Sequence, residues 1–561
     1  MAIYSQAHIC QCLTRLSTLR RNSVITITAK RQKTGDQFVT DVLSLARGLL
    51  ELGLRSGDIV AICAFNSDCY LEWLLAVAYV GGIVALLNYR WSFEEAKSAM
   101  LSVEPVMLVS DESCNFWNLE LYSDTIPSLR WRVVLGSSSF DLTEASNILT
   151  AETLSMHSVR SLPLNYSWAP EGAVMICFTS GTTGRPKGVV ISHSALIVQS
   201  LAKVAIVGYC EDDVYLHISP LCHIGGLSSA IAMLMIGACH ILIPKFEAAL
   251  AIEVIEKYCV TSLITVPAIM GDLISFTRGK EIWQGSQTVK KILNGGGSLS
   301  VGLIKDAIKF FPRAKLLSAY GMTESCSSLT FMTHYDPRIK IPGQTYSKRK
   351  SNSVNQLQGV CVGKPAPHVE LKICTDGSSS QIGRILTRGP HVMLRYYNQN
   401  PSNALNYPNE DWLDTGDIGS IDDSGNLWLI GRSNNRIKSG GENVHPEEVE
   451  AILLQHPGIV AAIVLGIPDS RLSEMVVACI KLRQGWRWLD SNYRPLDENE
   501  LLLCSEILHK YCREKNLSGF KVPKKFILWR KPFPLTTTGK IRRDQIRREA
   551  MSHLQFLSCN L

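Results

Sequence analysis

A ten-residue segment joins hydroxyl, glycine and cationic residues directly after an apolar run. After the apolar residues 174–178, the chain reads Thr179, Ser180, Gly181, Thr182, Thr183, Gly184, Arg185, Pro186, Lys187 and Gly188. Glycines let backbone N–H groups approach phosphate oxygens, hydroxyls add donors, and the two cations offset phosphate charge. The spacing differs from the GxxxxGK[ST] of a Walker A loop. The segment therefore predicts a nucleotide-phosphate loop of another kind.

Five further segments place acidic, cationic or aromatic residues beside glycines. They are residues 320–324 (YGMTE), 412–417 (WLDTGD), 431–432 (GR), 437–442 (IKSGGE) and 534–540 (PLTTTGK). With the first segment, and in this order, they resemble the motifs of the adenylate-forming acyl-activating superfamily, which includes acyl-CoA ligases, luciferases and the adenylation domains of peptide synthetases. The resemblance covers nearly the whole chain. It implies that ATP activates a carboxylate as an acyl-adenylate, which coenzyme A then converts to a thioester.

The superfamily resemblance also implies which residues bind ATP. Those nearest the phosphates are Thr179, Ser180, Gly181, Thr182, Thr183, Gly184 and Lys187. The others form an adenine wall with a stacking ring (Gly295, Gly296, Gly297, Tyr320), an α-phosphate contact (Thr323) and a ribose pair (Asp417, Arg432). A carboxylate can accept several hydrogen bonds at once, which suits Asp417 to both ribose hydroxyls.

Three charged residues carry the implied chemistry. Glu324 matches the Mg²⁺ ligand, and Lys540, which also contacts ATP, matches the cation that bridges the attacking carboxylate and the α-phosphate. Such a cation stabilises the charge that develops in the transition state. Lys438 approaches the adenylate for thioester formation, after the C-terminal domain rotates about the hinge position Asn434, where the superfamily more often has Asp or Lys. The other basic residues near the end are expected to be solvated: Lys521, Arg542, Arg543 and Arg547.

The acyl site is expected between residues 220–226 (PLCHIGG) and the residues after Glu324. His223 lies where many superfamily members have an aromatic or histidine wall, and it is a candidate catalytic and pocket residue. Ser327 and Ser328 are small and polar, whereas a fatty-acid tunnel needs apolar residues at this place. The sequence therefore favours an aromatic acid with a second polar group.

Other functions share these motifs. Within the class, the alternative is a 4-coumarate- or medium-chain-type acyl-CoA ligase, and a luciferase-like oxygenase has the same adenylation residues. The presence of Lys540, Glu324 and Asp417 disfavours a catalytically inactive binding protein. The net charge of +7 is mild for 561 residues and does not indicate nucleic-acid binding. The expected partners are a small aromatic carboxylic acid, ATP with Mg²⁺, and coenzyme A; the sequence does not define an oligomeric state.

These motifs need a framework of alternating strands and helices. Apolar runs alternate with helical patterns, as in α/β folds, at residues 59–64, 106–109, 173–178, 241–243, 262–266 and 291–293. A polar break follows residue 430, and Pro446 then opens a helix. We therefore predict an acyl-CoA synthetase-like fold, with an N-terminal domain of α/β subdomains over residues 1–431 and a mobile α+β lid domain over residues 432–561. The polar residues 340–358 indicate an exposed insertion.

The composition is that of a globular protein. Hydrophobic residues make up 46% of the chain and charged residues 19%, which excludes a disordered chain or a coiled coil. The apolar stretch at residues 73–87 is too short to cross a membrane and contains two glycines, so it is expected to be buried. The 17 cysteines show neither CxxC pairs nor metal-site spacing, which predicts free thiols in a reducing compartment.

The two ends carry possible targeting signals. Residues 1–35 contain no Asp or Glu, as is typical of organellar transit peptides. Against this, residues 24–29 alternate like a strand, and apolar residues from 38 to 52 recur at helical spacing. The acid-free region is therefore expected to be at least partly folded. The last three residues, Cys-Asn-Leu, have the shape of a peroxisomal address with Asn in place of the usual basic residue.

Overall fold

A computed structural model of the chain describes residues 7–91, 93–111, 125–135, 148–150, 154, 166–180, 186–277, 283–339, 359–375, 381–398, 412–432, 437–439, 442–469, 472–489, 501–515, 517, 519–536 and 540–558. The chain falls into two compact units. The first comprises Met1–Asn352, Val362–Leu371 and Leu386–Leu413, and the second Ser353–Cys361, Lys372–Ile385 and Asp414–Leu561. The expected insertion at residues 340–358 and the last three residues lie outside the described residues. The division at residues 431 and 432 concerns a mobile lid and stays a prediction.

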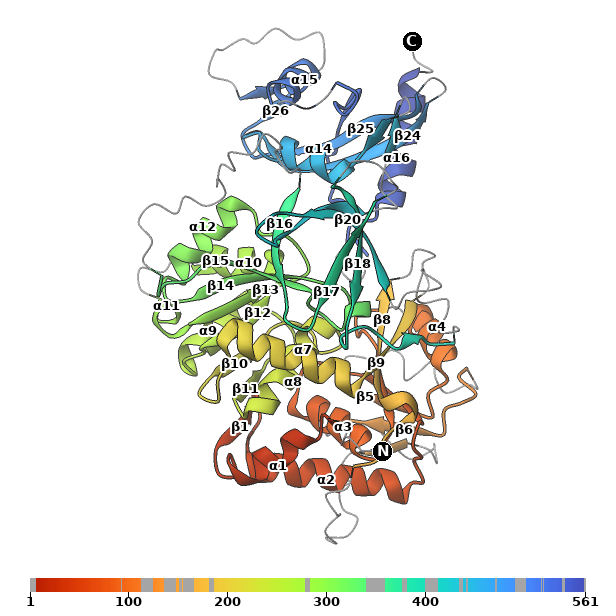
Figure 1. Ribbon diagram of the computed structural model, residues 1–561, viewed down its shortest axis with the longest axis vertical. Helices are drawn as coiled ribbons and strands as arrows, with labels where there is room; N and C mark the ends of the chain where they lie inside the picture. The colour runs from red at the N-terminus through yellow and green to blue at the C-terminus, as the bar shows by residue number, and fades with distance from the viewer. Residues whose placement is uncertain are drawn as a thin grey trace. The chain divides into compact units, whose positions relative to one another are not determined.

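The first unit contains a mainly parallel run of strands that is part of a larger sheet. Its strands run in the order β15-β14-β13-β12-β10-β11-β1-β2 (Figure 1). Their bounds are β1 (Val24–Ile27), β2 (Gln32–Thr34), β10 (Val214–His217), β11 (Cys239–Leu242), β12 (Ser262–Thr265), β13 (Lys291–Asn294), β14 (Lys315–Tyr320) and β15 (Thr330–Tyr335). Only the pairs β14–β15 and β1–β2 of this run are antiparallel. The carboxyl ends of β10, β12, β13 and β14 therefore share one edge, where α/β sheets bind their ligands.

A second sheet of the first unit has eight strands in the order β19-β9-β8-β4-β3-β5-β6-β7. Their bounds are β3 (Ile59–Cys63), β4 (Ile83–Leu86), β5 (Met107–Ser110), β6 (Trp131–Val134), β7 (Ile148–Thr150), β8 (Ala173–Ser180), β9 (Pro186–Ser192) and β19 (Arg395–Tyr396). The apolar runs at residues 59–64, 106–109 and 173–178 are confirmed as strands. Strands β8 and β9 are antiparallel neighbours, with Ser180 opposite Pro186.

Helices of the first unit pack against these sheets (Figure 1). They are α1 (Gln11–Thr18), α2 (Gly35–Glu51), α3 (Asp68–Tyr79), α4 (Phe93–Val103), α7 (His193–Lys203), α8 (Ile224–Ile236), α9 (Ala248–Lys257), α10 (Pro267–Thr277), α11 (Gly285–Thr288) and α12 (Val301–Phe310). The π-helical turn η3 (Val204–Gly208) directly follows α7. The expectation that residues 73–87 are buried is confirmed, since this stretch forms the end of α3 and strand β4, and Trp73 is fully buried.

The N-terminal segment is part of the folded unit. Strand β1 lies parallel to β11, with Thr26 opposite His240 and Ile27 opposite Ile241. Helix α1 buries Leu13 and Leu16 completely in the largest core cluster. The strand and the helix expected at residues 24–29 and 38–52 are confirmed as β1 and α2.

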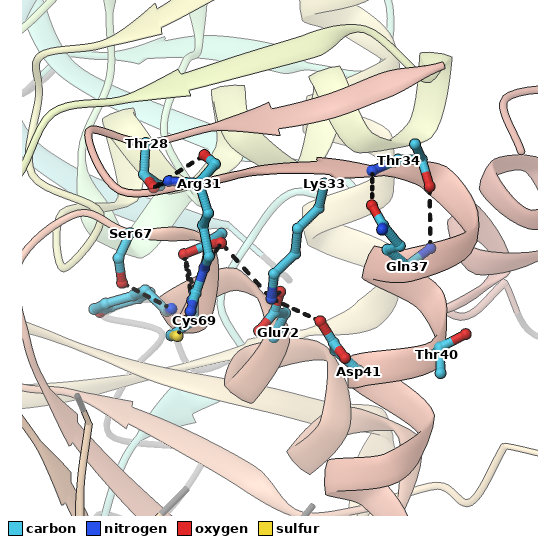
Figure 2. Close-up of polar contacts among 12 residues, drawn as sticks. Thr28, Arg31, Lys33, Thr34, Gln37, Thr40, Asp41, Ser67, Cys69 and Glu72 are labelled. Carbon is cyan, nitrogen blue, oxygen red and sulfur yellow. Dashed lines mark hydrogen bonds and ion pairs between the residues drawn. The ribbon is translucent and has the colours of Figure 1, made fainter. Parts of the chain in front are cut away.

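Buried charges fasten strand β2 to α3 (Figure 2). The guanidinium of Arg31 donates to both carboxylate oxygens of Asp68, at 2.6 and 2.9 Å. Lys33 forms ion pairs with Glu72 and, at 2.7 Å, with Asp41 of α2. The carboxylates of Asp68 and Glu72 are only 2% and 4% exposed, so these cations are their counter-charges.

The second unit contains a hairpin and a small α+β body. The hairpin consists of β20 (Leu413–Ile421) and β21 (Leu427–Arg432). The body has the strands β22 (Ile437–Ser439), β23 (Glu442–Val444), β24 (Ile459–Asp469), β25 (Ser473–Leu482), β26 (Arg487–Trp488), β27 (Leu502–Leu503) and β28 (Lys525–Leu528), with the helices α14 (Pro446–Leu453), α15 (Ser505–Glu514) and α16 (Arg543–Ser558). Helix α14 begins at Pro446, as predicted. Residues of β16 (Val360–Pro365), β17 (Glu370–Cys374) and β18 (Gly383–Arg388) are divided between the two units.

Two further observations concern the described residues as a whole. All of their cysteines are free thiols. None of their helices has the length and apolar character needed to cross a membrane.

Candidate active site

The two described ends of the glycine-rich segment belong to β8 and β9. Thr179 is opposite Lys187, so the described ends of the segment are paired strand residues rather than loop. Gly181, Thr182, Thr183 and Gly184 lie outside the described residues, as does the side chain of Ser180. The structure therefore describes only the strand residues at the two ends of this segment, and Lys187 is the second residue of β9.

Lys187 belongs to a chain of contacts that ends at Glu324. Its ammonium lies 5.4 Å from the ring centre of Tyr396, within cation–π range. The Tyr396 hydroxyl donates to Oε1 of Glu324 at 2.9 Å. Two effects raise the pKa of Tyr396 well above its usual range: burial, which is the larger, and the negative charge of Glu324. The Glu324 backbone is fixed as well, because its carbonyl accepts from the N–H of Met393 at 2.9 Å. Two residues expected to face nucleotide, Lys187 and Glu324, are thus joined by a third.

The segment that carries Glu324 is tightly folded. The 3₁₀ turn η4 (Thr323–Ser325) contains Thr323 and buries Glu324, which is 8% exposed. Gly321 precedes it, and any Cβ there would collide with the Ser327 carbonyl, so this position requires glycine. Cys326 and Ser327 have φ values of 52° and 112°, which non-glycine residues rarely adopt. Such strain persists only where surrounding contacts hold it.

The expected adenine residues follow neighbouring parallel strands. Gly295, Gly296 and Gly297 come directly after β13, and Tyr320 is the last residue of β14. Asn294 closes the glycine turn by donating to the Gly297 carbonyl at 2.8 Å. Since β13 and β14 are parallel, these residues lie at the same sheet edge, and a Cβ on Gly295 would enter open space. This arrangement agrees with a flat backbone wall, whose adenine contact stays a prediction.

The expected acyl residues lie on two segments that one helix connects. His223 is the N-cap residue of α8, after the Pro220 turn that follows β10. Ser327 is partly exposed and Ser328 buried, and their hydroxyls are 3.4 Å apart. Gln199 of α7 donates to the carbonyls of Ser325 and Ser328, at 3.0 and 2.7 Å. Because α7 also packs against α8, it supports both sides of the expected acyl site.

The expected ribose residues lie on the β20–β21 hairpin of the second unit. Asp417 is opposite Arg432 in the antiparallel register. Asp417 is 5% exposed, and its backbone N–H donates to the Thr415 hydroxyl at 3.1 Å. The side chain of Arg432 lies outside the described residues. The two residues predicted to act as a pair are therefore neighbours across two strands.

The two expected catalytic lysines also belong to the second unit. Lys540 is exposed; its N–H donates to the Thr536 hydroxyl at 3.1 Å and its carbonyl accepts from the Thr536 N–H at 2.6 Å. Lys438 is in β22, opposite Asn443, and its side chain is not described. The hinge candidate Asn434 lies outside the described residues. The roles of all three remain predictions.

The expectation that the other C-terminal basic residues are solvated is wrong for two of them. Arg543 donates to both carboxylate oxygens of Glu450, at 2.6 and 2.8 Å, and is 22% exposed. Lys521 binds both oxygens of Glu448, at 2.8 and 2.9 Å. Both acids are on α14, so these cations fasten distant segments to that helix. Spacing along the chain could not reveal partners about 73 to 93 residues away.

Sequence reasoning missed Tyr396 and Gln199. Tyr396 reaches Glu324 because β19 pairs with β9, a contact between residues about 200 positions apart that no local pattern encodes. Gln199 did leave a signal, since it is a polar residue on the apolar face of a helix and is completely buried. A polar residue in that position is expected to bond buried backbone groups.

The fold and these sites define the class of protein. The family model described as AMP-binding enzyme matches residues 17–397, and the model of the AMP-binding enzyme C-terminal domain matches residues 448–540. The chain therefore belongs to the AMP-binding enzyme family. This agrees with the predicted superfamily and with the predicted fold of a large α/β part and a smaller C-terminal part.

Individual relatives narrow the class. The chain is 57% identical to the 2-succinylbenzoate–CoA ligase, chloroplastic/peroxisomal, of Arabidopsis thaliana, over the whole of both chains. It is 29% identical to the indoleacetate–CoA ligase of Aromatoleum aromaticum over 90% of each. The solved o-succinylbenzoate CoA synthetase of Bacillus subtilis, in complex with its acyl-adenylate intermediate, has the same fold, with a TM-score of 0.74 at 24% identity over 96% of this chain and 97% of that one. The Bacillus protein is also known in complex with ATP and magnesium ion, with a TM-score of 0.74 at 24% identity over 95% of this chain and 98% of that one.

Proposed function

We infer that the chain is an acid–CoA ligase that uses ATP to convert 2-succinylbenzoate to 2-succinylbenzoyl-CoA. The observation that carries this conclusion is the 57% identity, over the full length of both chains, to the Arabidopsis ligase with that activity in its name. The polar residues expected at the acyl site also suit an aromatic dicarboxylate better than a fatty acid. We therefore place the reaction on the route to the naphthoquinone ring of phylloquinone.

The reaction has two half-reactions. The succinyl carboxylate attacks the α-phosphorus of ATP, the bond to the bridging oxygen breaks, and pyrophosphate leaves. The thiolate of coenzyme A then attacks the acyl carbon and AMP leaves. We assign Lys540 to the first step, where a cation offsets charge on the carboxylate and α-phosphate, and Lys438 to the second. Asp417 and Arg432 hold the ribose, and Lys187 offsets phosphate charge.

Glu324 is suited to hold Mg²⁺. Hard divalent cations prefer carboxylate oxygens, and the Tyr396 hydroxyl occupies one of the several acceptor positions of this carboxylate. Bound Mg²⁺ neutralises triphosphate charge. What the chain itself contributes is orientation, because Tyr396 and the Met393 N–H fix both the side chain and the backbone of Glu324.

The same relative supports a location in the chloroplast, the peroxisome or both, as its printed name states for that protein. The folded segment from α1 to β2 limits where a transit peptide could be cleaved without loss of structure. A cut after residue 35 removes the cations that pair with Asp68 and Glu72. We therefore expect that, after import, the mature N-terminus lies before α1. Mass spectrometry of the imported protein measures its position.

A substrate panel tests the proposed function. Consumption of coenzyme A is measured with 2-succinylbenzoate, 4-coumarate and octanoate under identical conditions. We expect the highest kcat/KM with 2-succinylbenzoate, and preference for either other acid contradicts the assignment. Light emission or oxygen uptake in place of thioester formation identifies a luciferase-like oxygenase.

Separate half-reactions test the two lysines. Lys540→Ala is expected to slow adenylation, followed as pyrophosphate release, by about 100-fold or more, while thioester formation from supplied acyl-adenylate stays largely intact. Lys438→Ala is expected to show the reverse pattern. Lys525→Ala, which removes an exposed lysine of β28, is the control. Equal loss of both half-reactions in Lys540→Ala contradicts its role.

A further inference from the structure

Helix α7 carries two completely buried polar side chains one turn apart. Gln199 and Lys203 are both 0% exposed. Residues four positions apart lie on the same helix face, so both side chains point in one direction. A fully buried lysine is rare unless it is paired. The contacts of these two side chains therefore indicate what this face of α7 does.

Gln199 holds one wall of the acyl site. Its amide donates to the carbonyls of Ser325 and Ser328, and its carbonyl accepts from the Ser328 N–H at 3.4 Å. Between these two serines lie Cys326 and Ser327, the residues with positive φ. The amide thus spans the strained part of the loop and fixes the wall that Ser327 and Ser328 form.

Lys203 lies against the other wall. Its ammonium donates to the hydroxyls of Ser228 and Ser229, at 2.5 and 3.1 Å, and to the Gly225 carbonyl at 3.3 Å. These residues are in the first turns of α8, directly after His223. Lys203 also lowers the pKa of Cys326, although burial raises that pKa overall to about 12. The hydrogen bonds of Lys203 are thus with the α8 side of the expected acyl site, while Gln199, one turn earlier on α7, contacts the other side.

The charge of Lys203 has no acidic partner in the part of the chain that the structure describes. Ion pairs there involve other lysines, and only hydroxyl and carbonyl oxygens surround this ammonium. Burial lowers the pKa of Lys203 to about 7. Holding a buried charge without a counter-charge costs several kcal/mol. The three neutral oxygens accept from the ammonium but do not balance its charge, which an anionic ligand could do.

We propose that Lys203 is a specificity-determining residue, which favours acids that carry a second carboxylate. The proposal rests on the proposed function and deepens it. In 2-succinylbenzoate the succinyl carboxylate is activated, and the ring carboxylate remains an anion that can balance the ammonium. Gln199 is a positioning residue that fixes the opposite wall.

The hydroxyls of Ser228 and Ser229 can connect the Lys203 ammonium to the ring carboxylate of the substrate. Each accepts from the ammonium and donates to a helix carbonyl, Ser228 to Ile224 at 2.6 Å and Ser229 to Gly225 at 3.0 Å. Rotation about one C–O bond redirects such a proton to a carboxylate oxygen. The π-helical turn that begins at Val204 follows Lys203 immediately, and such turns are frequent at functional sites.

A pair of acids that differ only in the second carboxylate tests the proposal. 2-Succinylbenzoate is compared with 4-oxo-4-phenylbutanoate, which keeps the reacting carboxylate and lacks the ring carboxylate. Lys203→Met is expected to lower kcat/KM for 2-succinylbenzoate about 100-fold and that for the analogue by no more than about 3-fold. Lys203→Arg, which keeps the charge, is expected to retain more of the preference than Lys203→Met.

Lys291→Met is the matched control. It removes an ammonium that is 16% exposed and lies 2.7 Å from the Asp213 carboxylate in the same unit. This variant is expected to lose stability without changing the ratio of the two acids. Activity on the analogue shows that Lys203→Met is folded.

The outcomes separate the two hypotheses. If the wild-type protein uses 2-succinylbenzoate but Lys203→Met loses activity equally on both acids, or on neither, the role of Lys203 is overturned and the proposed function stands. If the wild-type protein does not use 2-succinylbenzoate, the proposed function is overturned and this proposal with it.

Discussion

Two regions of the first unit bury charged side chains in opposite ways. In the N-terminal region, the buried acids Asp68 and Glu72 are each paired with a cation from β2 or the turn before it. At the candidate active site, Lys203 has hydroxyl and carbonyl partners, and Glu324 is held by the Tyr396 hydroxyl. Both regions are dense with polar contacts. They differ in whether the counter-charge comes from the protein.

The difference separates a structural charge from one kept for a ligand. A buried ion pair that is complete within the chain fixes one element on another, as β2 is fixed on α3. A buried charge surrounded by neutral partners costs stability until an opposite charge arrives. By this criterion, we propose that Lys203 binds a carboxylate and Glu324 a cation, whereas the charges of the N-terminal cluster are structural.

The largest expected effect is from breaking the complete cluster. Lys33→Met leaves Glu72 buried without its counter-charge, and removing one partner of a buried pair costs about 3–5 kcal/mol. The free energy of unfolding in urea is expected to fall by that amount. Arg21→Met is the control, because its pair with Asp36 is 64% and 49% exposed and is worth under about 1 kcal/mol. Equal effects of the two variants would remove the contrast between buried and exposed pairs.

A smaller effect is expected from the neutral side chain beside Lys203. Gln199→Leu leaves the carbonyls of Ser325 and Ser328 without a donor, at a cost of about 1–3 kcal/mol. Because the strained Ser327 wall then relaxes, kcat/KM is expected to fall about 10-fold on the dicarboxylate and the monocarboxylate alike. Leu201→Gln, at an exposed position of the same helix, is the control. A loss confined to the dicarboxylate would transfer to Gln199 the selectivity proposed for Lys203.

Removing the hydroxyl partner of Glu324 is expected to have a more modest effect. Tyr396→Phe keeps the ring that Lys187 contacts but takes away the bond to Oε1. One hydrogen bond to a charged group is worth about 1.5–3 kcal/mol before compensation by solvent or metal. We expect the Mg²⁺ concentration for half-maximal activity to rise about 5-fold, with the melting temperature nearly unchanged. An unchanged Mg²⁺ dependence would contradict the assignment of Glu324 to the metal.

Local patterns predicted the framework of both regions. Apolar runs located β3, β5, β8, β12 and β13, and Pro446 marked the start of α14, because strand and helix periodicity and proline geometry are properties of short segments. The residues of the expected ATP site were predicted from motifs, and the parallel order of β13 and β14 explains why Gly295 and Tyr320 lie at one sheet edge.

Partners distant in sequence were not predictable. The Tyr396 bond to Glu324 and the Arg543 bond to Glu450 join residues 72 and 93 positions apart, and a single sequence does not encode such pairs locally. The charge of Lys203 was equally hidden, because a lysine at a helix end usually lies in solvent and offsets the helix dipole. Only packing shows that this one is buried.

Removing the charge of Lys203 tests the comparison directly, because loss of a lysine with a counter-charge is expected to lower stability, whereas loss of a buried lysine without one is not. Burial lowers the pKa of Lys203 from 10.5 to about 7, so between these values the unfolded chain binds more protons than the folded one. The stability of the wild-type protein therefore gains from Lys203 deprotonation as the pH rises through this window. Lys203→Met, of similar volume, removes that dependence, so its stability relative to the wild type is expected to be highest at pH 6 and to decline toward pH 9. Melting temperatures across this range measure the difference. A variant several kcal/mol less stable at pH 6 would mean that the ammonium already has a counter-charge in the free protein, as Lys33 has, and that the two regions bury charge in the same way.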